Sequence, residues 1–198
     1  MGRFTRARGK TTLRLDTDEL QLLMQAVNEL IGLLDDGVTQ PFPELVHDAE
    51  DPFSAWEASF GSEPSIEDEL TEIEHDPVER RLFPPAYPDD PAASSDFQRF
   101  TQDEQRRSKI RDAMTVLDDL ESVTRGIARI PSDHYDAWMK TLNNLRLVLS
   151  VMLGITDEIS NAEAAERPDE DPRAWLFTFY SWLGWMLESL LECVLAPE

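Results

Sequence analysis

Apolar residues recur three and four positions apart in four stretches of this sequence, which is the period at which an α-helix presents one apolar face. The stretches are residues 16–37, about 92–124, 132–154 and 173–195. Capping residues precede two of them and glycines end two of them, as helix boundaries require. The pattern predicts a mostly α fold, an irregular bundle of four to five helices with a small N-terminal β element.

The apolar residues within each stretch predict which helix faces are buried. Those of the second stretch are Phe97, Phe100, Ile110, Met114, Leu117, Leu120 and Val123. The third stretch presents Trp138, Leu142, Leu145, Leu149 and Met152. The last stretch is apolar nearly all round, so we expect it to lie at the centre of the bundle and to contact every other helix.

Charge is spread unevenly over the chain. The 40 Asp and Glu residues outnumber the 18 Lys and Arg residues and give a net charge of −22. A field of this sign repels nucleic acid and anionic membranes, so we expect no direct nucleic-acid binding by the acidic body and no membrane association.

Residues 1–14 form a basic arm on this acidic chain. The arm holds Arg3, Arg6, Arg8, Lys10 and Arg14 and no acidic residue. A turn signal at Gly9 and alternating residues after it predict two short strands. The arginines are either solvated on an edge hairpin or form a contact surface for a phosphate backbone or an acidic partner, and Arg3, Arg6, Arg8 and Lys10 are the candidate contacts.

An acidic tract follows the first helical stretch. Residues 35–79 hold fifteen acids, no Lys or Arg, and five prolines. Within the tract, we expect residues 38–62 to be a flexible acidic segment of a single helical domain that spans residues 1–198. Phe42, Phe53, Trp56 and Phe60 lie in the tract and either pack on the bundle or await a partner. Residues 157–172 are expected to form a second acidic loop.

Catalytic and metal-binding patterns are weak. Two Glu-x-x-His spacings, Glu44 with His47 and Glu72 with His75, have the spacing used by carboxylate-bridged metal sites, but both lie in the proline-broken tract. The single cysteine, Cys193, excludes a disulfide within the chain and lies on an apolar helix, where a thiol is usually inert. We therefore expect no enzyme activity and no cofactor.

Targeting signals are also lacking in this sequence. No apolar segment follows the arginines of the arm, so no secretory signal is expected. Residues 175–187 are thirteen uncharged residues, too few to span a bilayer, and we expect them to form a core helix. The predicted location is the cytoplasm.

Four segments resemble one protein family. The segments are residues 76–90, 96–101, 138–147 and 180–190. The chain resembles an actinobacterial family long catalogued as a domain of unknown function, which includes the actinomycete oxidative-stress regulator AosR and is often encoded beside the ClpS adaptor. The resemblance implies a helical cytosolic protein with a role in redox-responsive transcription through a sigma factor. A cysteine pair near the N-terminus belongs to that proposal, and this sequence has none, so its signal would have to come from elsewhere.

The resembling segments supply the remaining candidate residues. They are Arg80, Arg81, Tyr87, Asp89, Asp90, Arg99, Asn143 and Arg146. We expect the four arginines of this set to form internal ion pairs that fasten the second and third helices, since a lone buried charge is costly. The alternative is that they line a surface for a partner.

Three functions follow as hypotheses. The first is a protein-binding regulator acting on transcription through a sigma factor, and the second is an adaptor in protein turnover that binds a component of the Clp system. The third is a carboxylate-metal enzyme, for which the sequence offers the least support. A homodimer is left open by the sequence.

Overall fold

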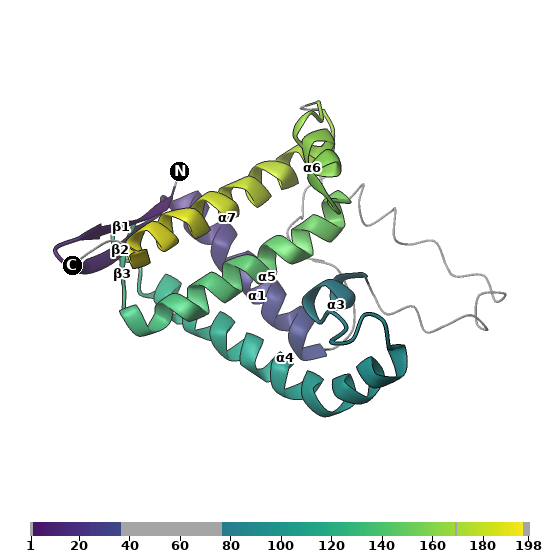
Figure 1. The fold of residues 1–198 in the computed structure, drawn as a ribbon. Coiled ribbons are helices and arrows are strands. Elements are labelled where there is room, and N and C mark those ends of the chain that lie inside the picture. The colour runs from purple at the N-terminus through teal and green to yellow at the C-terminus, as the bar shows by residue number, and fades with distance from the viewer. Residues whose placement is uncertain (1, 37–76, 169, 196–198) are drawn as a thin grey trace.

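The computed structural model describes residues 2–36, 77–168 and 170–195, and these residues form a helical bundle with a small sheet at one end (Figure 1). The elements, in chain order, are β1 (Arg3–Ala7), β2 (Lys10–Arg14), α1 (Thr17–Asp36), α3 (Pro77–Leu82), α4 (Pro91–Glu121), β3 (Ile127–Ile130), the 3-10 turn η2 (Ser132–His134), α5 (Tyr135–Leu153), α6 (Glu158–Ala165) and α7 (Pro172–Leu195). The predicted mostly α fold with a small β element is confirmed.

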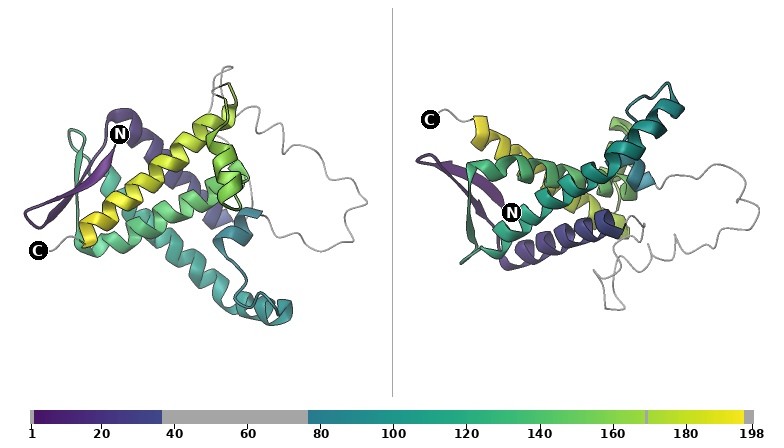
Figure 2. Two further views of the ribbon diagram at one scale, coloured as in Figure 1. Left: turned by 45° about the horizontal axis from the view of Figure 1, so that its top comes forward. Right: turned by 90° about the horizontal axis from the view of Figure 1, so that it is seen from below.

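The sheet combines the basic arm with a strand from the middle of the chain. Its order is β1-β2-β3, with both pairs antiparallel. The two predicted strands of the arm are confirmed. The third strand, β3, was not predicted. Its four residues, Ile127–Ile130, follow a glycine turn and alternate between exposed and buried positions. The views in Figure 2 show the β1-β2 hairpin extending past the ends of the helices.

The helix boundaries follow their capping residues. At the start of α1, Asp16 accepts a hydrogen bond from the Glu19 amide at 2.8 Å, and Glu19 accepts one from the Asp16 amide at 3.0 Å. This reciprocal pair is the predicted capping box. At the end of α5, Gly154 adopts a φ of 71°, a left-handed conformation that glycine takes without strain.

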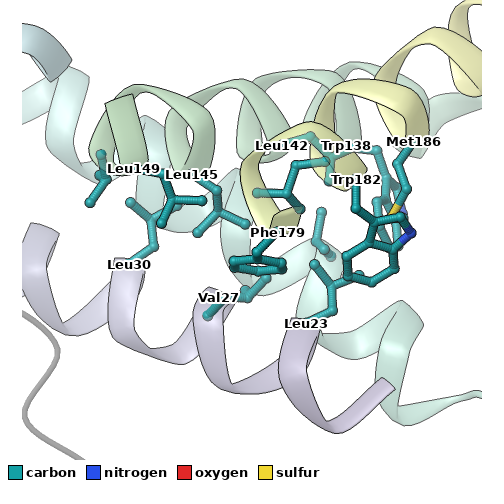
Figure 3. Packing of buried hydrophobic residues seen from close by; sticks show 14 of the residues in the cluster. Leu23, Val27, Leu30, Trp138, Leu142, Leu145, Leu149, Phe179, Trp182 and Met186 are labelled. Carbon is teal, nitrogen blue, oxygen red and sulfur yellow. The ribbon is translucent and has the colours of Figure 1, made fainter. Parts of the chain in front are cut away.

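The core lies where α1, α5 and α7 meet (Figure 3). Its labelled side chains are Leu23, Val27 and Leu30 of α1, Trp138, Leu142, Leu145 and Leu149 of α5, and Phe179, Trp182 and Met186 of α7. The central helix is α5, which packs against α7, α4, α3 and α1, whereas α7 packs mainly on α5, β1 and α6. The prediction that the last helix occupies the centre was wrong, because one side of α7 faces solvent at Trp185 and Glu188.

The buried face of α4 also differs from the predicted one. Phe100 is 83% exposed and Met114 is 54% exposed, although both belong to the predicted apolar face. Leu120 of the predicted face is buried as expected, but the other buried apolar positions are Ala113 and Val116, which were not predicted. The helix contacts α1 and α5 along this stripe, and the Phe100 and Met114 side chains lie largely outside it.

A short helix occupies part of the second acidic segment, which was predicted to be a loop. Asp157 accepts a hydrogen bond from the Ser160 amide at 2.8 Å, and the Ser160 hydroxyl accepts one from the Asp157 amide at 3.0 Å. This capping box begins α6, and Ala164 is buried beneath it. The prediction failed because the capping pair used a serine at the third helical position instead of the acid that is commonest there.

None of the helices in the described ranges has the length and apolarity to cross a bilayer. The uncharged run at residues 175–187 lies in α7, where Leu183 and Met186 are fully buried. The prediction that this run forms a helix packed into the core is confirmed, although α7 is not the central helix.

Candidate partner-binding surface

A tight turn gives the basic arm its shape. Arg8 and Gly9, between the paired residues Ala7 and Lys10, have φ values of 53° and 73°. Two successive residues with positive φ form the type I′ turn, whose twist matches that of a two-stranded antiparallel ribbon. The arm is therefore a regular hairpin, and the direction of each of its side chains follows from the strand alternation.

One face of the sheet is part of the core. Phe4, Leu13 and Ile130 are buried, and the Phe4 ring meets the Trp138 ring edge-on at a centroid distance of 5.1 Å. The Phe4 amide also donates a hydrogen bond to Ser189 of α7 at 3.1 Å. Since this face is fixed against the helices, the opposite face of all three strands points to solvent.

The outer face of the sheet is basic. Its exposed cations are Arg3 on β1, Lys10 and Arg14 on β2, and Arg129 on β3, with Arg8 at the hairpin turn. We call these five residues the basic sheet face. The three strands contain no acidic residue. Exposed cations therefore gather at one end of a protein whose net charge is −22.

The pairing register places like charges together. Arg3 lies directly opposite Arg14 across β1 and β2, and Thr12 lies between Thr5 and Arg129. Like charges at directly opposed positions destabilise a sheet. Within the described ranges, no residue of the basic sheet face forms an ion pair or a side-chain hydrogen bond. An anionic partner would relieve this repulsion.

Arg6 differs from the other cations of the arm. Its side chain is half-buried on the inner side of the sheet and donates a hydrogen bond to the Cys193 carbonyl at 2.9 Å. A cation at the C-terminal end of a helix is favoured by the helix dipole, so Arg6 fastens β1 to α7. Burial raises the pKa of the neighbouring Cys193 thiol and so disfavours its thiolate form.

The predicted arm contacts therefore divide into two groups. Arg3, Arg8 and Lys10 lie on the basic sheet face, while Arg6 has a structural contact. Arg129 was not predicted as a candidate. The alternating residues of β3 carried the signal for it, but four residues are too few to establish a strand from periodicity alone.

A second group of predicted residues surrounds the start of α4. Asp90 caps this helix by accepting a hydrogen bond from the Ala93 amide at 3.0 Å. The Tyr87 ring is half-exposed and meets the Phe97 ring edge-on. The neighbouring Asp89 is exposed. These residues act as a helix start, and they lie at the opposite end of the molecule from the sheet (Figure 1).

The expected ion pairs of Arg80, Arg81 and Arg99 are not found among the described residues, where all three side chains are exposed. The pair that joins α3 to α4 is instead Glu79 with Arg106. The Arg106 guanidinium also lies 4.9 Å from the centroid of the Phe83 ring. Sequence reasoning missed this pair, since spacing along the chain does not show which arginine of α4 reaches α3.

Arg146 also lacks the expected carboxylate in the described part of the chain. Its guanidinium lies 4.7 Å from the centroid of the Tyr180 ring on α7, and its Nη2 donates a hydrogen bond to the Tyr180 hydroxyl at 3.1 Å. The guanidinium also packs against Gly184, where a Cβ atom would lie 3.4 Å from the guanidinium carbon. A cation on an aromatic ring, and not an ion pair, connects α5 to α7 at this point. The neighbouring candidate, Asn143, is exposed.

Replacing Arg146 with alanine should lower the free energy of unfolding by about 1–2 kcal/mol, from the lost contact with Tyr180 and the lost packing of the side-chain stem. Urea denaturation would measure the loss. Arg99→Ala, an exposed arginine on α4, is the control and should stay within about 0.5 kcal/mol of the parent. Unchanged stability of Arg146→Ala would contradict the structural role.

Both Glu-x-x-His pairs lie outside the described residues. Within the described ranges, no group of three His, Cys, Asp or Glu side chains is placed to hold a metal ion. The geometry of the described residues therefore offers the basic sheet face as the candidate site.

These features define a class: a small helical protein with a three-stranded sheet whose outer face is basic. The chain belongs to the family described as Domain of unknown function (DUF2017), whose model matches residues 1–194. No curated protein and no solved structure matches the chain.

Proposed function

We propose that this chain is a protein-binding regulator that uses the basic sheet face to contact its partner, acts on transcription through a sigma factor, and functions in the oxidative-stress response. The observation that carries protein binding is the set of five exposed cations, Arg3 opposite Arg14 among them, on a sheet without acids. The sigma factor and the stress response rest on the resemblance to the family of AosR. In this proposal the protein works in the cytoplasm and catalyses no reaction.

A matched pair of variants tests the proposal. The sheet variant replaces Arg3, Lys10, Arg14 and Arg129 with glutamine. The helix variant replaces Arg80, Arg81, Arg99 and Arg107 with glutamine. Each variant removes four exposed positive charges, so the two have the same net charge. The sheet variant should fold at least as stably as the parent, because it removes the repulsion between Arg3 and Arg14.

The experiment is affinity purification from a native lysate with the parent and both variants as bait. We expect the parent and the helix variant to retain a sigma factor, and the sheet variant to lose it. Retention of Clp components by the parent would favour the adaptor hypothesis instead. Loss of the partner from the helix variant alone would move the contact surface to the start of α4 and overturn the proposal.

A further inference from the structure

The basic sheet face has a defined size. A strand of five residues is about 17 Å long, and three strands together are about 10 Å wide between the outer backbones. Along β2, Lys10 and Arg14 are four residues apart, or about 14 Å. The face is therefore as long as a short extended peptide and much smaller than most protein interfaces.

Four of the five cations on this face lie in two groups, and Arg129 lies beside Thr12, between the two groups. Arg3 and Arg14 oppose each other at one end, and Arg8 and Lys10 are at the hairpin end. The Thr5 and Thr12 hydroxyls lie between the groups, with 3.1 Å between their oxygens. In an extended peptide, side chains on one face repeat every second residue, about 7 Å apart. Acidic residues at alternate positions would therefore reach both groups of cations.

The side-chain types on this face also favour carboxylates. Three of the four cations on the strands are arginines, whose planar guanidinium groups bind carboxylates through two parallel hydrogen bonds. The Thr5 and Thr12 hydroxyls hydrogen-bond to each other at 3.1 Å, which leaves at most one hydroxyl hydrogen for a bound carboxylate. The arginines of this face therefore suit an acidic peptide.

Nucleic acid suits the same face poorly. The outer positions of the three strands carry no aromatic residue on which a base could stack. A duplex has a charge about every 1.7 Å and would extend beyond the sheet. Subtracting the five charges of the face from −22 leaves −27 for the rest of the chain, which would repel that extension. A short acidic segment stays within the cationic area.

We infer that the basic sheet face binds an extended acidic segment of a partner protein, with acidic residues at alternate positions lying along β2. The inference rests on the proposed function, because it specifies the chemistry of the partner at the same surface. It predicts that the recognised segment is short and linear, so a synthetic peptide can replace the whole partner.

The test uses the full chain and a fluorescent peptide, about seven residues long, in which glutamate alternates with threonine. Fluorescence anisotropy at low salt measures its affinity for the parent, the sheet variant and the helix variant. We expect the sheet variant to bind about tenfold or more weakly than the parent, and the helix variant to stay within about twofold. An oligothymidylate of equal charge should bind the parent about tenfold more weakly than the peptide.

Equal peptide affinity in the parent and the sheet variant would overturn the inference. Oligothymidylate binding as tight as that of the peptide would overturn it in favour of a phosphate backbone. Self-association of the parent that the sheet variant lacks, measured by sedimentation, would overturn it in favour of a second copy of the chain. If the lysate partner depends on the sheet face while the peptide does not bind, the proposed function stands and only the acidic segment is refuted.

Discussion

Replacing Asp119 with alanine is expected to lower the free energy of unfolding by about 3 kcal/mol. The Asp119 carboxylate is buried on α4 and accepts a hydrogen bond from the Trp138 indole at 2.8 Å. His134 Nδ1 lies 3.0 Å from the same carboxylate oxygen. Without the carboxylate, the fully buried indole N–H loses its acceptor, and an unsatisfied buried donor is costly.

Two further variants make this prediction specific. Asp119→Asn keeps one carbonyl oxygen and should lose about half as much stability. Asp118→Ala changes the exposed neighbour on the same helix and should stay within about 0.5 kcal/mol of the parent. Urea denaturation followed by circular dichroism would measure all three variants. Equal stabilities for Asp119→Ala and Asp118→Ala would show that the hydrogen bond between α4 and Trp138 contributes little.

Replacing Leu120 with alanine should lower the free energy of unfolding by about 3 kcal/mol, because Leu120 is 1% exposed and its removal leaves a cavity in the core. Met114→Ala on the same helix should cost less than about 0.5 kcal/mol, because Met114 is 54% exposed. Thermal and urea unfolding of both variants would measure the contrast. Comparable losses of stability in the two variants would indicate that Met114 is buried, as the sequence pattern predicted.

The pair of variants also shows where periodicity stops being informative. Met114 and Leu120 both fit the spacing of one apolar helix face, and spacing correctly predicted that α4 is a helix. Whether a side chain of α4 is buried depends on which other helices pack against its turn of the helix. The first turns of α4 extend beyond α1 and α5, as Figure 2 shows, so Phe97 and Phe100 are exposed despite their periodicity.

The candidate surface was predicted in part. The excess of arginine in the arm, the turn at Gly9 and the alternation after it were enough to expect a basic hairpin. The contribution of Arg129 depends on the pairing of β2 with β3, which joins segments more than a hundred residues apart. Pairing between distant strands is not encoded in any local pattern, so the complete face could not be assembled from the sequence.

The arginines of the resembling segments show the same limit. These arginines are few and the acidic residues are many, so we expected each arginine to find an acidic partner nearby. In the folded chain Arg146 faces Tyr180 on α7, and Glu79 pairs with Arg106. Charge counts predict a field around the molecule, but an ion pair needs two side chains to converge within about 4 Å.

By itself, the sequence determined the four long helices, the basic hairpin and the separation of charge between arm and body, because these follow from local periodicity, capping and composition. The tertiary structure decided that α5 and not α7 occupies the centre, that a narrow stripe of α4 is buried, and that Arg129 joins the arm on one sheet. These features depend on contacts between segments far apart in the chain, and only the packed fold brings such segments together.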